Sequence, residues 1–244
     1  MNKKITGIGI LLILLLLPAC SKKEPAVVKK ESPPEITESD PELVEQVIKE
    51  ESEEFIEFSL KDEKVLINLK MVPILDEYLQ ASRDKQRKIK QMELIELEKK
   101  ENENIYILKF SCYEEQCSYI LLDQDSDNTA FLLADLAELA EVKLSPDESR
   151  ILFHFNREST SSIPFSNLTV IDVEAWERLS PIPEIETKSM LQFEWPILSA
   201  SWQGNDAVIA EFPNVTEPNE EQFFEWFEQD HLTKTITYQL ESNS

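Results

Sequence analysis

The acidic run that begins at residue 123 is the part of the sequence best suited to binding a metal ion. Asp123, Asp125 and Asp127 alternate with short polar residues, and alternate carboxylates in a turn can direct oxygen atoms at a hard cation such as Ca²⁺. An EF-hand loop would need Gly and Glu at the positions of Asn128 and Ala134. Asp, Asn and Ser are also common in solvated hairpin turns. The three aspartates are therefore metal candidates, but the pattern favours a turn without metal.

No pattern in the sequence indicates catalysis. The chain has 3 Gly and 2 His, and it lacks Gly-x-Ser-x-Gly and the phosphate-binding glycine loops. His154 and His231 have no partner at the spacing of a metal motif. With 48 acidic residues, carboxylate pairs alone do not indicate a glycosidase. We predict no catalytic residue and no cofactor; a hydrolase with unrecognised carboxylates is the alternative.

Large aromatic residues gather near the C-terminus, and Trp195, Trp202 and Trp226 are the binding candidates among them. Exposed aromatic rings favour contacts with proteins or stacking on sugars. The alternative interpretation is that these rings fill a hydrophobic core.

The first residues have the order of an export signal. Lys3 and Lys4 precede an apolar run over residues 7–17, which is shorter than the roughly 20 residues that span a bilayer. A basic start, a short apolar run and a small residue before the cleavage point describe a secretory signal. We therefore predict a signal peptide over residues 1–19.

Leu17-Pro18-Ala19-Cys20 resembles the lipobox of bacterial lipoproteins. The resemblance implies cleavage before Cys20, a diacylglycerol on its sulfur and an extracytoplasmic protein held to the membrane by lipid. That membrane is the cell membrane, or the outer membrane where the host has two. Each buried methylene adds about 0.8 kcal/mol, so two or three chains anchor a protein stably. An ordinary signal peptide with a chance cysteine is the alternative.

Cys112 and Cys117 flank a four-residue turn between two strand-like runs. An exported protein can keep disulfides oxidised, and this spacing can bring the two cysteines together across a hairpin. We predict a disulfide; two free thiols and a redox pair are the alternatives. Redox motifs normally separate the cysteines by two residues, and a zinc site would need further ligands.

The formal net charge of −24 limits the partners. Nucleic acid is excluded, because its binding depends on Lys and Arg that neutralise phosphates. One basic cluster, Arg83 to Lys90, stands apart from the acidic background. Cations suit the end of a solvated helix; the alternative is a contact with envelope polyanions, lipid headgroups or an acidic protein.

Composition divides the mature chain in two. Residues 20–52 hold the anchor and a stretch rich in Lys, Glu, Ser and Pro, which predicts a flexible acidic tether with one short helix starting at Asp40-Pro41-Glu42. Residues 53–244 form the predicted β-rich domain. It begins with a hairpin over 55–69, and the spacing of apolar residues then predicts one helix near 73–91.

Three later segments repeat the same order of four strand-like runs. They are residues 92–133, 140–179 and 197–240. Asp123, Asp172 and Glu228 end the third run of each segment and are 49 and 56 residues apart. A period near 50 with four strands per unit is typical of propeller blades. Residues 129–142 and 217–230 also have helical character, but the repeat favours strands there.

Residues 145–153, which begin Ser-Pro-Asp-Glu-Ser-Arg, resemble the turn-and-strand signature of TolB-type and WD-repeat β-propellers. Residues 168–173 followed by Trp176 resemble their next hairpin. The resemblance implies a mainly β, propeller-like fold of about three to four antiparallel meander units. Glu148 occupies the usual Gly position, and closure typically takes four or more blades, so an open stack or a twisted sandwich is the alternative.

We therefore expect a lipid-anchored, non-enzymatic module that binds an envelope protein or polymer. A receptor for a carbohydrate or another small ligand is the second hypothesis.

Overall fold

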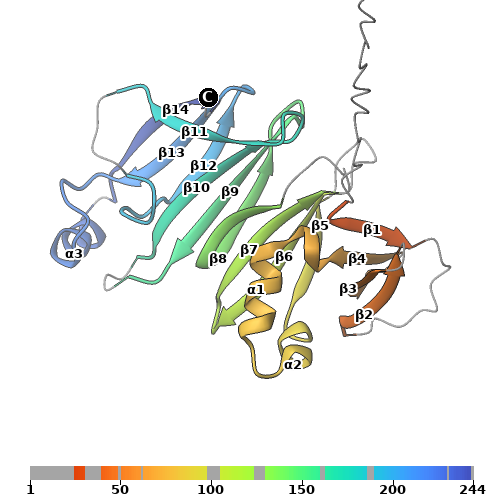
Figure 1. The fold of residues 1–244 in the computed structure, drawn as a ribbon. Coiled ribbons are helices and arrows are strands. Elements are labelled where there is room, and N and C mark those ends of the chain that lie inside the picture. The colour runs from red at the N-terminus through yellow and green to blue at the C-terminus, as the bar shows by residue number, and fades with distance from the viewer. Residues whose placement is uncertain are drawn as a thin grey trace, which may run out of the picture.

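The computed structural model describes residues 25–30, 40–48, 51–61, 63–97, 105–123, 130–159, 163–185, 190–229 and 231–242. They form two antiparallel sheets and three α-helices (Figure 1). The prediction of a mainly β fold is confirmed. The predicted signal peptide and Cys20 lie outside the described residues.

The smaller sheet has the strand order β1-β4-β3-β2. Its strands are β1 (Val27–Lys30), β2 (Glu42–Ile48), β3 (Glu51–Ser59) and β4 (Lys64–Asn68). The hairpin predicted over 55–69 is present as β3 and β4. The helix predicted from Asp40 is wrong, because Glu42–Ile48 pairs with β3 along its whole length. Strands β1 and β2 both lie within residues 20–52, for which composition predicts a flexible tether. That prediction is therefore wrong for these two segments.

The predicted helix near 73–91 is two helices, α1 (Pro73–Ala81) and α2 (Lys85–Ile89), preceded by a 3₁₀ turn at Leu69–Met71. Pro73 starts α1, and Leu75 and Leu79 are fully buried. Ser82 has an extended backbone and ends α1. The Asp84 side chain then accepts a hydrogen bond from Arg87 N and caps α2. Local capping therefore overrides the continuous helical pattern.

The larger sheet has ten strands in the order β12-β13-β14-β11-β10-β9-β8-β7-β6-β5. The strands are β5 (Glu93–Leu97), β6 (Ile105–Tyr113), β7 (Gln116–Asp123), β8 (Phe131–Leu144), β9 (Arg150–Arg157), β10 (Phe165–Asp172), β11 (Glu177–Pro183), β12 (Ser199–Gln203), β13 (Ala207–Pro213) and β14 (Thr233–Ser242). Among the described residues β5 and β12 are its two edges, and the strands close into neither a barrel nor a propeller.

The separate propeller-like units predicted from the repeat are wrong, because the repeats merge into one sheet. Strand β8 is 14 residues long and pairs with β7 on one side and β9 on the other. It thus joins the last strand of the first repeat to the first strand of the second. The strand predicted at 223–228 is also wrong, since these residues belong to α3 (Glu220–Glu228).

Three hydrophobic clusters hold the sheets together. The first lies between the small sheet, α1 and one face of β5–β7. The second uses the other face of β6 and β7 together with β8–β10. The third covers the opposite face of β9–β14 and takes in Phe223 of α3. Because β6 is covered on both faces, its residues Ile105 to Leu108 are all buried.

Candidate functional site

All three predicted tryptophan candidates belong to the third hydrophobic cluster or pack against it. Trp195 is 5% exposed, and Lys234 Nζ lies 4.3 Å from its ring centroid. Trp202 is half-buried and donates a hydrogen bond from Nε1 to the Lys143 carbonyl oxygen at 3.1 Å. Trp226 differs, because it lies on α3 beside exposed aromatic residues.

The metal candidates are not brought together in the described part of the chain. Asp123 ends β7, and Asp125 and Asp127 lie outside the described residues. No group of three or more His, Cys, Asp and Glu side chains is placed to hold a metal among the residues described. His154 is buried, its Nε2 has no hydrogen-bond partner there, and burial lowers its pKa.

The two hairpin cysteines form a disulfide, as the sequence predicts. Cys112 and Cys117 are bonded, with their Cα atoms 4.0 Å apart. The register of β6 and β7 shifts between Phe110 and Tyr113, so the bond closes the hairpin at an irregular point. The Cys112 side is exposed, whereas Cys117 is buried in the core.

The basic cluster lies on α2 and its flanks. Lys85 pairs with Glu54 at 3.7 Å and Lys90 with Asp40 at 3.4 Å, and Lys88 Nζ lies 6.0 Å from the Tyr78 ring centroid. Three of its cations therefore contact groups of the same chain, which supports the interpretation as a solvated helix end.

Helix α3 follows a strong local start signal. The Asn219 side chain accepts a hydrogen bond from Gln222 N at 3.0 Å, and Glu220 and Glu221 occupy the first turn, where the helix dipole favours negative charge. Phe223 is fully buried and meets Phe165 edge to face, with ring centroids 6.4 Å apart. Phe223 thus anchors α3 to the large sheet, and α3 lies at the end of the molecule far from the small sheet (Figure 1).

The outward side of α3 and the segment after it expose large apolar groups. Phe224 is 65% exposed, Phe227 42% and Leu232 62%. Trp226 is half-buried, and its ring stacks on His231 with centroids 5.0 Å apart. We call this group the α3 surface; it consists of Phe224, Trp226, Phe227, His231 and Leu232.

Hydrogen bonds hold the Trp226 and His231 rings of this surface in place. Trp226 Nε1 donates to the Leu232 carbonyl oxygen at 2.6 Å, and His231 Nε2 lies 2.8 Å from the Phe227 carbonyl oxygen. The Gln222 side chain accepts from Thr216 N at 2.8 Å and from Glu217 N at 3.1 Å. A cavity of about 190 Å³ lies between α3 and the segment 214–216. Exposed rings held in place lose little entropy on binding a partner.

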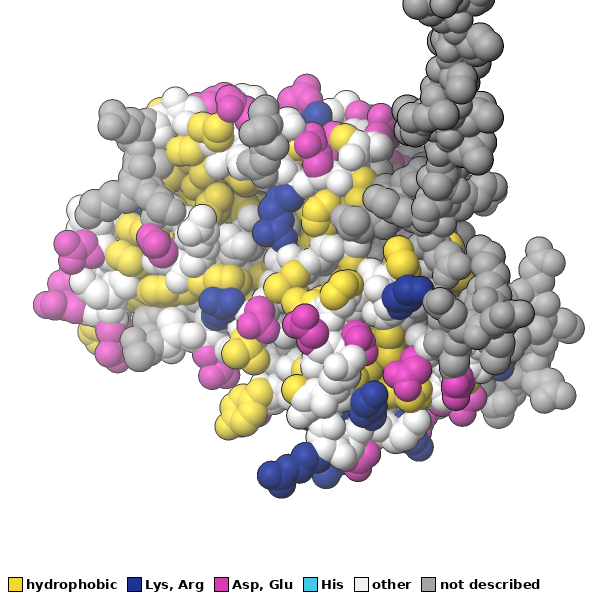
Figure 2. Space-filling model, viewed as in Figure 1, with side chains coloured by type: hydrophobic (Ala, Val, Ile, Leu, Met, Phe, Trp, Pro, Cys, Tyr) yellow, Lys and Arg dark blue, Asp and Glu magenta, His cyan; other side chains and the backbone are white. Residues whose placement is uncertain are grey.

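The segment that carries these rings is acidic. Residues 214–232 contain six Asp and Glu and no Lys or Arg. Figure 2 shows acidic side chains around the apolar ones at the α3 end of the molecule. Carboxylates beside exposed aromatic faces attract cations, both by charge and by the ring quadrupole.

Sequence reasoning noted the aromatic residues of this segment and its helical character, but it named only Trp226 as a binding candidate and followed the repeat in placing residues 223–228 in a strand. The signal for the helix is Pro218-Asn219-Glu220-Glu221, a proline and a cap followed by an acidic first turn, and the repeat was given more weight than this signal.

The chain matches no protein-family model, and neither a curated protein nor a solved structure shows significant similarity to it. No helix among the described residues is long and apolar enough to cross a membrane.

Proposed function

We propose that this protein is a lipid-anchored, non-enzymatic binding module of the bacterial envelope, and that its α3 surface docks a basic segment of a partner protein. The observation that carries the proposal is a group of exposed apolar side chains within a segment of six acidic and no basic residues. The lipobox resemblance at Cys20 supports the anchor.

The chemistry of the surface selects the partner. An exposed ring contributes about 0.5–1 kcal/mol when a Lys or Arg lies over its face, and an exposed ion pair adds up to about 1 kcal/mol. Several such contacts around Phe224 and Phe227 would give a specific but salt-sensitive complex. Polyanionic envelope polymers would be repelled by the same carboxylates, so a basic protein segment fits better than a polymer.

Site-specific crosslinking in cells tests this proposal. A photo-crosslinking residue in place of Phe224 should capture a protein through a Lys- or Arg-rich segment. The same residue in place of Tyr113, which is 73% exposed on a distant hairpin, is the matched control and should not. Glu225→Lys with Glu228→Lys should remove the adduct. Equal capture from both positions, or a captured segment without basic excess, would refute the proposal.

Sugar stacking on the exposed ring of Phe224 is the second use of this surface. A glycan array would detect it, and binding there that survives the double charge reversal would favour it.

A further inference from the structure

The large sheet splits between β10 and β11. The two strands pair from Asp172–Glu177 to Val170–Leu179 and no further, although both continue. In an antiparallel pair, backbone groups two residues apart point to the same side. Glu184 N donates to the Thr237 carbonyl oxygen of β14, so the even-numbered residues of β11 direct their backbone groups at β14 and the odd-numbered ones at β10. After Leu179, the next group directed at β10 belongs to Pro181, which has no N–H to donate. Pro183 repeats the effect, so the sequence itself opens the sheet.

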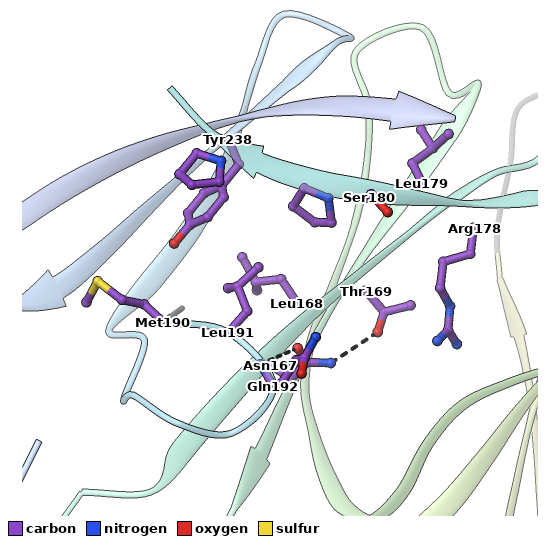
Figure 3. Close-up of a pocket in the computed structure, with 12 residues that line it drawn as sticks. Asn167, Leu168, Thr169, Arg178, Leu179, Ser180, Met190, Leu191, Gln192 and Tyr238 are labelled. Carbon is purple, nitrogen blue, oxygen red and sulfur yellow. Dashed lines mark hydrogen bonds between the residues drawn. The ribbon is translucent and has the colours of Figure 1, made fainter. Parts of the chain in front are cut away.

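The split forms a cavity of about 570 Å³ (Figure 3). The register places Asn167, Thr169, Arg178 and Ser180 on one face of the sheet. Leu168 and Tyr238 project from the other face, and Met190 with Leu191 lines the cavity from the loop before β12. The cavity is thus lined by polar side chains from one face of the sheet and by apolar side chains from the other. Its volume is in the range of small-molecule sites.

The charge of the cavity is opposite to that of the chain. One residue in five of the sequence is Asp or Glu, yet none of the described residues that line the cavity is acidic, and Arg178 supplies a positive charge. Arg178 Nη2 donates to the Leu132 carbonyl oxygen, which orients the guanidinium across the sheet. A guanidinium in such a place suits a carboxylate, whose geometry it matches.

One polar group in the cavity lacks a partner. Tyr238 is 2% exposed, and its buried hydroxyl forms no hydrogen bond within the described chain. Figure 3 shows this hydroxyl on the side of Met190. Burial raises the pKa of Tyr238 to about 12, so the hydroxyl keeps its proton. Buried hydroxyls are almost always paired, and an orphan in a cavity indicates a missing partner.

We propose that this split-sheet pocket binds one small amphipathic carboxylate, with its carboxyl group at Arg178, its apolar body along Leu168 and Leu191, and a second polar group at the Tyr238 hydroxyl. The pocket and the α3 surface share no lining residue, so this inference does not depend on the proposed function.

Calorimetric titration of the full-length protein in phosphatidylcholine nanodiscs tests the inference, with empty nanodiscs subtracted. The probe is 8-hydroxyoctanoate, which carries a carboxylate and a distal hydroxyl. We expect one-to-one binding that is at least tenfold tighter than the binding of the matched cation 8-hydroxyoctylammonium. Equal affinity for the two probes, or no binding of the anion at millimolar concentration, would overturn the inference.

Three variants locate the site. Arg178→Gln should weaken 8-hydroxyoctanoate binding about tenfold. Tyr238→Phe should weaken the hydroxy acid but leave octanoate unchanged, which a merely structural role would not produce. Ser180→Trp places a ring in the mouth without changing the core and should abolish binding of both acids. Phe224→Ser, on the α3 surface, is the control and should change nothing. Full affinity in the Ser180→Trp variant would refute the site.

Discussion

Asp147 organises the turn between β8 and β9 with a single carboxylate. Its Oδ1 accepts from Ser145 Oγ at 2.7 Å, Ser149 Oγ at 2.8 Å and Ser149 N at 3.1 Å. These hydrogen bonds lower the pKa of Asp147 to about 2. They also hold Glu148 at a φ of 62°, a conformation that usually requires Gly. The side chain network therefore replaces the glycine that the propeller signature has at this position.

The first prediction follows from this pKa. Because the folded-state pKa is depressed, Asp147 stabilises the fold above its unfolded pKa near 3.8, and this stabilisation is lost as the pH falls towards 2. Asp147→Asn should therefore destabilise the protein at pH 6 and have a much smaller effect at pH 2. Urea unfolding of both proteins across this range measures the difference. A difference that does not change with pH would contradict the assignment.

Two neighbouring phenylalanines on α3 should differ sharply. Phe223 is fully buried, whereas Phe224 is 65% exposed. Phe223→Ala removes the side chain that fixes α3 to the sheet and should cost about 3–5 kcal/mol of unfolding free energy. Phe224→Ala should change stability by less than about 0.5 kcal/mol. Denaturant unfolding tests the pair, and a comparable loss in both variants would show that α3 is placed differently.

At the scale of elements, the sequence predicts what local patterns determine. The hairpin at Cys112–Cys117, the strand β9 and the turn before it follow from alternation and turn residues, and the structure has them. Two predictions failed, the separate units and the strand at 223–228, and both relied on the repeat. A repeat period does not say whether units separate, and the long strand β8 joins two of them. The period also favoured a strand over the capping signal at Asn219, and the local signal prevailed.

The candidate sites could be predicted only in part for the same reason. Trp226 was identifiable by type, but its exposure depends on which side of α3 faces the sheet. The pocket depends on β11 leaving β10 after Leu179 and continuing along β14. The paired residues of β11 and β14 are 55 to 63 positions apart in the sequence, so this pairing is set by tertiary packing, which the alternation of side chains along one strand does not reveal.

The disulfide gives a prediction at this scale. Cys112 and Cys117 are 5 residues apart in sequence, and closing so short a loop stabilises a fold by about 2 kcal/mol in the chain-entropy model. The double substitution to serine should lower the unfolding free energy by about this amount and leave the far end of the sheet intact. Amide exchange should show the loss confined to β6, β7 and β8. Loss of protection in β12 and β13 would contradict this.

For the whole molecule, the position of β1 limits how far the domain can lie from the membrane. Val27 is 2% exposed and pairs with Ile67 in the small sheet. If Cys20 carries the lipid, six residues separate the anchor from this strand, and a chain of that length spans at most about 25 Å. The domain would then be held close to the bilayer, not lifted from it by a tether of some thirty residues.

Releasing β1 should therefore move the domain away from the membrane. Val27→Asp places a charge in the core of the small sheet and should detach β1, so that the tether runs from Cys20 to β2 at Glu42. The root-mean-square reach of the tether would rise from about 15 Å to about 26 Å. Förster transfer from a dye on the domain to acceptor lipids should fall accordingly.

Val28→Asp is the matched control, since Val28 is 38% exposed and points away from the core. Unchanged transfer in the Val27→Asp variant, with β1 shown to be detached by amide exchange, would mean that the lipid is not at Cys20 or that other contacts hold the domain at the membrane.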